Sequence, residues 1–283
     1  MATTTHYWQS LWEETIRQSS NSNRIDGLSN VDRINLHAEL VYKNFYSKRN
    51  LDDLQRKPEF WVELNRLKRF ITKDSSVLDI GAGFGRIAVP LAKEVRRLTA
   101  VEPARVYMKL MKDKADREGV GNIEFAEDLW SDFPLRKKYD FVYSTLSLAI
   151  SDPDTLMKMN DASRGYCALE LGASPSSDLD FNQIYSMVKG ESFRPPGNYL
   201  NIITTLYDNG IYANLETWEV TSEVKYETVE DLVELRKTSL KPYVRVTEEM
   251  EEMLHRFYRS KMNSDGTYVF HVKGAACMIW WKV

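Results

Sequence analysis

The chain has 283 residues, of which 43% are hydrophobic and 28% are charged, and its net charge is −3 at pH 7. This composition is typical of a globular protein with one sizeable core and an appendage. So small a charge gives no electrostatic footprint for nucleic acid, although it leaves room for a local basic groove. No apolar run has the length of a membrane span and the first residues lack the apolar core of a signal peptide, so we expect a cytoplasmic protein without a membrane partner.

The cysteines and histidines give no sign of a metal centre. Cys167 and Cys277 both lie in runs that predict strands, which favours buried reduced thiols over a disulfide. Neither the i, i+4 pairing nor the cysteine partners of a zinc site accompany His6, His37, His255 and His271. We therefore expect no metal ion.

Roughly the first 70 residues predict a helical extension. Helical periodicity occurs at about 6–18, 38–48 and 59–71. A polar break at 19–23 and a polar linker separate the first of these segments from the second. We expect residues 1–70 to precede the main domain, at 71–283.

A strand, a glycine turn and a helix are predicted around Asp79. The apolar run 77–80 contains this acid, and a helical pattern begins after the turn. The turn itself is Gly81, Ala82, Gly83, Phe84 and Gly85. Glycine adopts positive φ and lets a ligand approach without meeting a Cβ, so the turn favours a nucleotide-like ligand over a purely structural role. The third glycine comes one residue too early for the dinucleotide pattern Gly-x-Gly-x-x-Gly.

The next segments continue the alternation of strands and helices. The apolar run 98–101 ends at Glu102, which Pro103 follows. A carboxylate at the carboxyl end of a strand can accept two hydrogen bonds from ribose hydroxyls. A helix at 105–118 and a short strand at 123–126 are predicted next. The strand leads to Asp128 and Leu129.

This succession resembles the class I S-adenosylmethionine-dependent methyltransferases, whose motif I is the Asp-x-Gly-x-Gly-x-Gly string. The resemblance in motifs covers about residues 70–172, and the order of elements is similar as far as the C-terminus. It implies an α/β, Rossmann-like sheet of seven strands with helices on both faces. It also implies S-adenosylmethionine as cofactor and S-adenosylhomocysteine as product. The positions that match the family's cofactor-binding residues are Asp79, Gly81, Ala82, Gly83, Gly85, Glu102, Pro103, Asp128, Leu129 and Ser144.

The resemblance assigns roles to these positions. The glycine turn packs under the methionine part of the cofactor, and Glu102 matches the ribose-binding acid. Asp128 matches the acid that accepts a hydrogen bond from the adenine amino group, and the amide of Leu129 meets a ring nitrogen. Asp79 supports the turn and often reaches the cofactor's amino group; holding backbone amides at the strand end is its alternative role. For Asp128 the alternative is a turn or a helix cap.

The fourth strand is predicted at 139–144 and leads to Leu146 and Ser147, where the family places substrate-facing residues. Nucleobase amino-methyltransferases carry an Asn/Asp-Pro-Pro-aromatic string here, and RNA cytosine-C5 enzymes need a nearby cysteine. This sequence has neither, which argues against nucleic acid as the partner. Ser144 and Ser147 either line the acceptor pocket or serve only as turn residues.

The rest of the chain predicts further strands separated by helices. These are a helix at 152–163, a strand at 165–171, a helix at 198–209, a strand at 213–226, helices at 228–240 and 247–262, and a strand at 267–283. We expect the last two strands to form the reversed hairpin that closes the methyltransferase sheet. We expect 173–197 and 228–262 to cap the acceptor pocket, with a packed appendage or a dimer surface as the alternative. The stretch 144–171 also resembles uncharacterised methyltransferases of archaea and anaerobic bacteria.

The aromatic residues near the N-terminus allow two interpretations. In the family, N-terminal helices often fold over the cofactor, and such a lid would exclude water. Alternatively the aromatic rings pack against the helices that flank the sheet. The candidate substrate-pocket residues are Tyr7, Trp8, Trp12, Leu146 and Ser147.

Methyl transfer from a sulfonium is an in-line displacement, so placing the nucleophile supplies much of the catalysis and no fixed set of side chains is obligatory. The candidate bases are His6, Tyr7, Glu170 and His255, and the sequence selects none of them. We expect a methyltransferase that acts on a small-molecule acceptor. A protein side chain as acceptor, and a non-catalytic cofactor-binding regulatory or partner subunit, are the alternatives. The sequence predicts neither the acceptor atom nor the oligomeric state.

Overall fold

The computed structural model describes residues 6–43, 58–174 and 178–283. Its helices are α1 (Tyr7–Arg17), the 3-10 helix η1 (Ser20–Asn23), α2 (Asn30–Val41), α3 (Pro58–Lys68), α4 (Ala88–Ala92), α5 (Arg105–Arg117), α6 (Pro153–Ala162), α7 (Leu179–Lys189), α8 (Tyr199–Asp208), α9 (Val229–Leu240) and α10 (Glu248–Arg259). Its strands are β1 (Ser76–Ile80), β2 (Arg97–Val101), β3 (Ile123–Ala126), β4 (Tyr139–Thr145), β5 (Ser163–Gly172), β6 (Asn214–Tyr226) and β7 (Tyr268–Lys282). Every strand predicted from the sequence is present.

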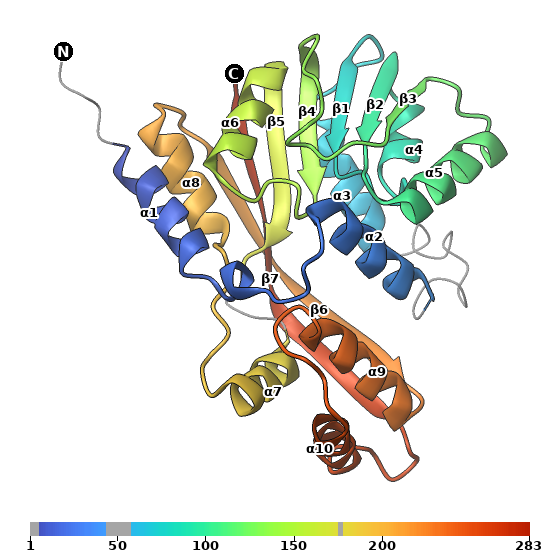
Figure 1. Cartoon of the computed structure of the whole chain (residues 1–283). Helices are drawn as coiled ribbons and strands as arrows, with labels where there is room; N and C mark the ends of the chain where they lie inside the picture. The colour runs from blue at the N-terminus through green and yellow to red at the C-terminus, as the bar shows by residue number, and fades with distance from the viewer. Residues whose placement is uncertain (1–5, 44–57, 175–177) are drawn as a thin grey trace. The chain divides into compact units, whose positions relative to one another are not determined.

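The strands form one sheet in the order β3-β2-β1-β4-β5-β7-β6 (Figure 1). The pairs β1 with β2, β1 with β4, β2 with β3 and β4 with β5 are all parallel. β7 runs antiparallel to β5, because Val283 N donates to Gly165 O while Ala173 N donates to Ala275 O. The predicted seven-stranded α/β sheet with a reversed C-terminal hairpin is thereby confirmed.

β1 is the strand at which the order of the sheet changes direction. The chain proceeds from β1 to β2 and β3 on one side and then returns to β4 on the other. All five residues of β1 are buried, as expected of a parallel strand covered on both faces. In open α/β sheets, ligands bind outside the carboxyl ends of the strands at such a switch point. A ligand site is therefore expected at the carboxyl ends of β1 to β5.

Helix α2 differs from its prediction. It begins at Asn30, whereas helical periodicity was expected only from about residue 38. Ser29 starts the helix, since its hydroxyl accepts a hydrogen bond from Asp32 N at 3.1 Å. The polar residues that follow were taken for a linker because they carry little apolar periodicity. The last part of the predicted helix, 44–48, lies outside the described residues.

Helix α7 is a second difference, because no helix was predicted within the cap segment expected at 173–197. The Asp178 carboxylate caps the helix by accepting a hydrogen bond from Phe181 N at 2.8 Å. Gly190, with φ of 71°, ends it. Both signals are present in the sequence. The helix was not predicted because the flanking residues are rich in Ser, Pro and Gly, which are typical of loops.

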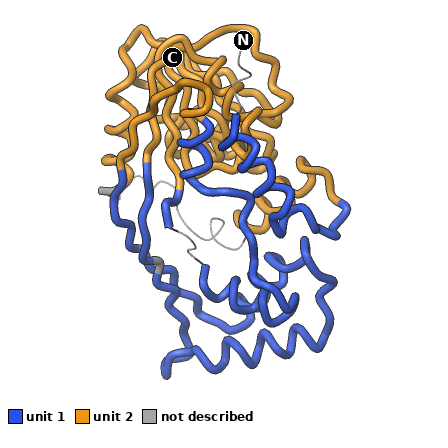
Figure 2. The backbone as a smooth tube through the Cα atoms, turned by 90° about the vertical axis from the view of Figure 1, so that its left-hand side faces the viewer, with its two compact units in different colours: residues 1–27, 172–205, 217–277 blue, residues 28–171, 206–216, 278–283 orange. Residues whose placement is uncertain are grey.

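The chain divides into two compact units (Figure 2). Unit 1 comprises residues 1–27, 172–205 and 217–277, and unit 2 comprises 28–171, 206–216 and 278–283. The chain passes from one unit to the other five times. Unit 2 holds the glycine turn and the parallel strands that frame it. The lid and cap roles expected of 1–70, 173–197 and 228–262 stay predictions.

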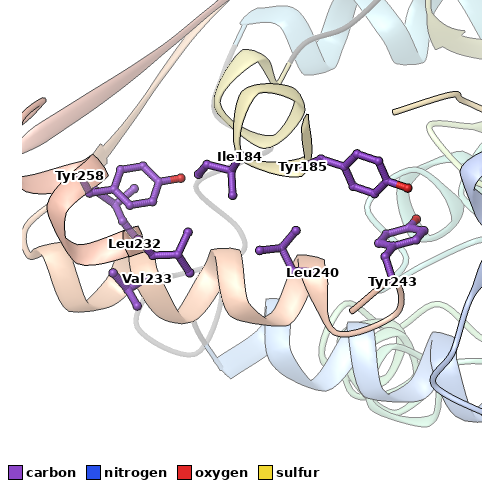
Figure 3. Packing of buried hydrophobic residues seen from close by; sticks show 8 residues of the cluster. Ile184, Tyr185, Leu232, Val233, Leu240, Tyr243 and Tyr258 are labelled. Carbon is purple, nitrogen blue, oxygen red and sulfur yellow. The ribbon is translucent and has the colours of Figure 1, made fainter. Parts of the chain in front are cut away.

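Unit 1 has a hydrophobic core of its own (Figure 3). Its buried members are Ile184, Tyr185, Leu232, Val233, Leu240, Tyr243, Leu254 and Tyr258. The rings of Tyr185 and Tyr243 meet edge to face with centroids 5.4 Å apart. Buried Arg236 is paired with Asp178 at 2.8 Å and donates to the Tyr258 hydroxyl at 2.8 Å. The charge of Arg236 is thus satisfied, and its pair with Asp178 joins α9 to the start of α7.

Candidate active site

The turn after β1 has the backbone geometry that its glycines predict. Gly81, Gly83 and Gly85 have φ of 72°, 57° and 78°, a region that other residues rarely adopt. Gly81 N donates to Val101 O at 2.8 Å, which ties the turn to the end of β2. A Cβ added at Gly83 would meet no heavy atom within 4 Å. The backbone at Gly83 therefore faces open space.

The other two glycines face protein atoms. A Cβ at Gly85 would lie 2.6 Å from Met111 Cγ, so this glycine lets α5 pack closely against the turn. A Cβ at Gly81 would lie 2.7 Å from Ser147 Cβ, so this glycine lets the segment after β4 approach. Of the three, only Gly83 has open space where a side chain would lie.

Glu102 follows β2 directly and is only 6% exposed. Its Oε2 accepts a hydrogen bond from Gly83 N at 2.7 Å, and its Oε1 accepts one from Ala104 N at 2.8 Å. Burial raises the pKa of the Glu102 carboxyl, and the two amide hydrogen bonds oppose that rise. Each carboxylate oxygen keeps a second lone pair, so the group still has the capacity to accept two ribose hydroxyls.

Asn35 of α2 supports the segment after Glu102, and the sequence analysis missed it. Its Oδ1 accepts a hydrogen bond from Arg105 N at 2.9 Å, and its Nδ2 donates to Pro103 O at 3.5 Å. Ala104 offers no side-chain cap for α5, so Asn35 satisfies a free amide at that helix start. No sequence signal existed, because the partners lie about 70 residues apart.

Asp79 lies inside the sheet at 2% exposure. The hydroxyl of Tyr143, its neighbour on β4, donates to Asp79 Oδ2 at 2.6 Å. Burial raises the pKa of Asp79 to about 7 against the lowering effect of this hydrogen bond, and the Glu102 charge adds to the rise. Asp79 therefore helps to hold β1 to β4, while its contact with a cofactor amino group stays a prediction. Tyr143 was missed because it was taken only as an apolar strand residue.

The segment beyond β3 is fixed by Trp130. This residue is buried, and its Nε1 donates to Thr155 O in α6 at 2.9 Å. Lys158 Nζ donates to Trp130 O at 2.7 Å. Asp128 and Leu129, both partly buried, are thereby held just past the carboxyl end of β3.

The end of β4 carries strained backbone. Buried Ser144 donates from Oγ to Ile80 O at 2.7 Å, so its hydroxyl serves the sheet. Leu146 has φ of 48°, and among the described residues other than glycine it alone has a positive φ. Its amide donates to Glu170 O at 2.8 Å, and Ser147 Oγ accepts from Ala149 N at 3.1 Å. Strained positions cluster at functional sites, which draws attention to this edge.

Glu170 lies on β5 beside Thr145 in the strand register. It is 7% exposed, and within the described part of the chain its Oε2 has no hydrogen-bond partner. Burial raises the pKa of Glu170 to about 8; the charge of Glu63 adds to the rise, and Arg66 and Arg86 oppose it. Arg86 itself forms a bidentate ion pair with Glu63, with both nitrogen–oxygen distances at 2.5 Å. Of the four candidate bases, only Glu170 belongs to unit 2.

The aromatic residues of α1 belong to unit 1. Trp12 is buried there, and its Nε1 donates to Pro196 O at 3.2 Å. The rings of Tyr7 and Trp8 meet edge to face with centroids 5.1 Å apart, and both side chains are exposed. Trp12 thus has a packing role within unit 1, and the lid role of the three stays a prediction.

Three further predictions from the sequence concern metal ions, membrane-spanning helices and cysteines. Within 6–43, 58–174 and 178–283, no group of three His, Cys, Asp or Glu residues is placed to hold a metal ion. None of the helices in those ranges has the length and apolar character needed to cross a membrane. Cys167 and Cys277 are both buried and unbridged, which confirms the prediction of buried thiols.

The positions along this edge fit an adenosyl ligand. Gly83, Glu102 and Asp128 follow β1, β2 and β3, which are neighbours in the sheet (Figure 1). An open backbone, a buried carboxylate and an acid with an adjacent amide therefore succeed one another in the order of the strands. The fold is that of an α/β protein of the Rossmann-like class, and this edge is its candidate nucleoside site.

Comparison with known protein families narrows the class of protein further. The family model described as a methyltransferase domain matches residues 77–164, from β1 through β5's start. Residues 77–164 are therefore similar to a methyltransferase domain, in agreement with the resemblance of these motifs to the class I S-adenosylmethionine-dependent methyltransferases.

Individual relatives are distant. A Methanosphaera stadtmanae protein named "Probable ribosomal RNA small subunit methyltransferase A" is 31% identical over 121 residues, which are 40% of this chain and 44% of that protein. The chain therefore spans less than half the length of this relative. An uncharacterised Haemophilus influenzae protein is 25% identical over 75% of this chain and 78% of its own length. A Bacillus halodurans structure described as a methyltransferase has a TM-score of 0.54 at 17% identity, covering 78% of this chain and 98% of that one.

Proposed function

We propose that the chain binds S-adenosylmethionine over the carboxyl ends of β1 to β3 and transfers its methyl group to a small-molecule acceptor. The observation that supports this most is the hydrogen bond from Gly83 N to Glu102 Oε2 at 2.7 Å. It joins the open part of the glycine turn to the acid in the ribose-binding position. Open space at Gly83 and a buried carboxylate directly beside it are together what a bound nucleoside would need.

The chemistry divides between ligand and protein. S-adenosylmethionine supplies a methyl group activated by a positively charged sulfur. The chain's own residues bind and orient: Glu102 would hold the ribose, and Asp128 with the amide of Leu129 would hold the adenine. Orientation of this kind supplies a large share of the rate in a displacement reaction.

RNA is a second candidate acceptor, because the Methanosphaera relative is named for ribosomal RNA. That match covers only 40% of this chain. Positions 144–148 lack the string that nucleobase amino-methyltransferases carry, and the net charge of −3 offers no general attraction for a phosphate backbone. A small molecule is therefore the acceptor class that we favour over RNA.

Calorimetric titration with S-adenosylmethionine and, separately, S-adenosylhomocysteine tests the proposal. We expect micromolar binding of both. If neither binds, the proposal is wrong. Incubation with methyl-labelled cofactor then sorts the acceptors: label is expected in an extracted small-molecule fraction, whereas label in purified ribosomal RNA would favour the second candidate. Label in neither, with intact binding, would favour a non-catalytic subunit.

A further inference from the structure

The switch point at β1 separates two places for ligands. The cofactor residues that the proposed function names, Gly83, Glu102, Asp128 and Leu129, follow β1, β2 and β3. A second reactant must then lie on the other side of the switch point, over the carboxyl ends of β4 and β5. The segments at those ends are 144–151 and 169–172.

Glu170 is the one ionisable residue in these two segments. Ser144, which has a polar side chain there, already donates its hydroxyl to Ile80 O. Glu170 Oε2, by contrast, is buried and has no partner in the described part of the chain. A buried polar atom left without a hydrogen bond is costly, so such an atom at a ligand edge calls for a partner that arrives with the ligand.

Unpartnered among the described residues, Glu170 Oε2 calls for a partner that brings a hydrogen-bond donor, such as the nitrogen–hydrogen group of an amine. Glu63 lies near it but is already engaged in the bidentate pair with Arg86, and Arg66 is the other charged neighbour. Burial among these groups keeps a proton on Glu170 near neutral pH. A positively charged ligand beside the carboxyl would favour its ionised form and would drive off that proton.

The rim formed by the segment after β4, the neighbour of β5 in the sheet, exposes two leucines. Leu146, whose amide is bonded to Glu170 O, is 64% exposed, and Leu148 is 92% exposed. Leu146 is held there by a backbone conformation that leucine rarely adopts. An acceptor that meets both the carboxyl and this rim needs a basic group and an apolar substituent.

We propose that Glu170 binds the basic nitrogen of the methyl acceptor, and that the acceptor is an amine with an apolar substituent. This inference rests on the proposed function. A protonated amine has no free lone pair and cannot act as a nucleophile. Its nitrogen–hydrogen bond breaks at the Glu170 carboxylate, the proton passes to Oε2, and the electron pair stays on the nitrogen. The neutral amine is then the nucleophile.

Benzylamine tests the inference, with benzyl alcohol as its uncharged counterpart. Both are titrated into the wild-type chain saturated with S-adenosylhomocysteine, and into the Glu170→Gln and Glu124→Gln variants. Glu124→Gln is the matched control, because Glu124 is also a strand glutamate but is paired with Lys137 at 2.7 Å. Carbon-13 NMR of labelled glutamate carboxyls follows the protonation of Glu170, whose signal is assigned by its loss in Glu170→Gln.

We expect benzylamine to bind more tightly than benzyl alcohol and to lower the midpoint of the Glu170 titration by about one pH unit, a tenfold change in proton affinity. Glu170→Gln should weaken benzylamine binding by about tenfold or more, and Glu124→Gln should leave it unchanged. No benzylamine binding, equal binding in Glu170→Gln, or an unmoved titration midpoint would each overturn the inference. Failure of S-adenosylhomocysteine itself to bind would instead defeat the proposed function.

Discussion

The two halves of the sheet's carboxyl edge differ in how their acids are satisfied. On the half formed by β1 to β3, Glu102 accepts two backbone amides and Asp79 accepts a tyrosine hydroxyl. On the half formed by β4 and β5, Glu170 keeps a buried oxygen without a partner in the described chain. The first half is organised before any ligand arrives, and the second is completed by what binds there. A shared cofactor suits the first arrangement, and a specific acceptor suits the second.

The largest effect should come from filling the open space at Gly83, in the half of the edge formed by β1 to β3. In Gly83→Leu a side chain enters the space beside the turn, and we expect binding of S-adenosylhomocysteine to fall by about a hundredfold or more, from steric exclusion and the lost approach of the backbone. Gly119→Leu is the control, because Gly119 also has positive φ and open space but lies in the turn after α5. Equal affinity in the two variants, measured by calorimetry, would contradict the site.

The next effect concerns Glu170 and the stability of the fold. Burial raises the folded-state pKa of Glu170 to about 8, well above the ordinary value for glutamate, so the folded chain holds a proton that the unfolded chain has lost. Stability should therefore fall as the pH rises from about 5 to 8, by up to roughly 1.4 kcal/mol per pH unit for this group, and the elevated pKa of Asp79 acts in the same direction.

Denaturant titrations of the wild type and Glu170→Gln across this pH range measure that slope. The variant should show a shallower decline, because glutamine does not titrate. Glu124→Gln should keep the wild-type slope, since the Lys137 hydrogen bond lowers the pKa of Glu124 and its own linkage lies at more acidic pH. Parallel slopes in the wild type and Glu170→Gln would mean that Glu170 is ionised throughout.

Glu102→Ala tests the half of the edge formed by β1 to β3. The substitution removes the ribose acceptor and also leaves Gly83 N without its partner. We expect S-adenosylhomocysteine binding to weaken by about 1–3 kcal/mol. Adenine alone, titrated into the same variant, is the control ligand, because it has no ribose and should lose less affinity. Unchanged binding of the nucleoside ligand would remove Glu102 from the site.

Tyr143→Phe should have the smallest effect, about 1 kcal/mol of unfolding free energy near neutral pH. The change removes the donor to Asp79 Oδ2. Since that hydrogen bond lowers the pKa of Asp79, its loss raises the pKa further, and the destabilisation should grow as the pH rises past about 7. Chemical denaturation at pH 6 and pH 8 measures the growth; the same loss at both values would mean that Asp79 does not titrate in this range.

The sequence predicted the strands and the glycine turn of the half formed by β1 to β3, because these depend on local patterns. A strand, three glycines and an acid after the next strand are all contiguous signals, and the structure places Gly83 against Glu102 as such a pattern requires. The order of the strands followed from the same alternation of strand and helix.

The residues that the sequence did not reveal act through distant partners. Tyr143 is hydrogen-bonded to Asp79, which lies 64 residues away in the sequence, and Asn35 is hydrogen-bonded to Arg105, which lies 70 residues away. Glu170 was one candidate base of four, and its burial and its place in unit 2 distinguish it. Such properties depend on packing between segments, which no local periodicity encodes.

The five passages of the chain between the two units have a consequence for how this protein can be divided. Neither unit is a continuous piece of sequence, so neither can be expressed by trimming one end of the gene. Strands β6 and β7 each contribute residues to both units. A deletion that removes unit 1 would need to cut and rejoin the chain at several points. Substitution or loop insertion can therefore change either unit more readily than replacement of the whole unit can.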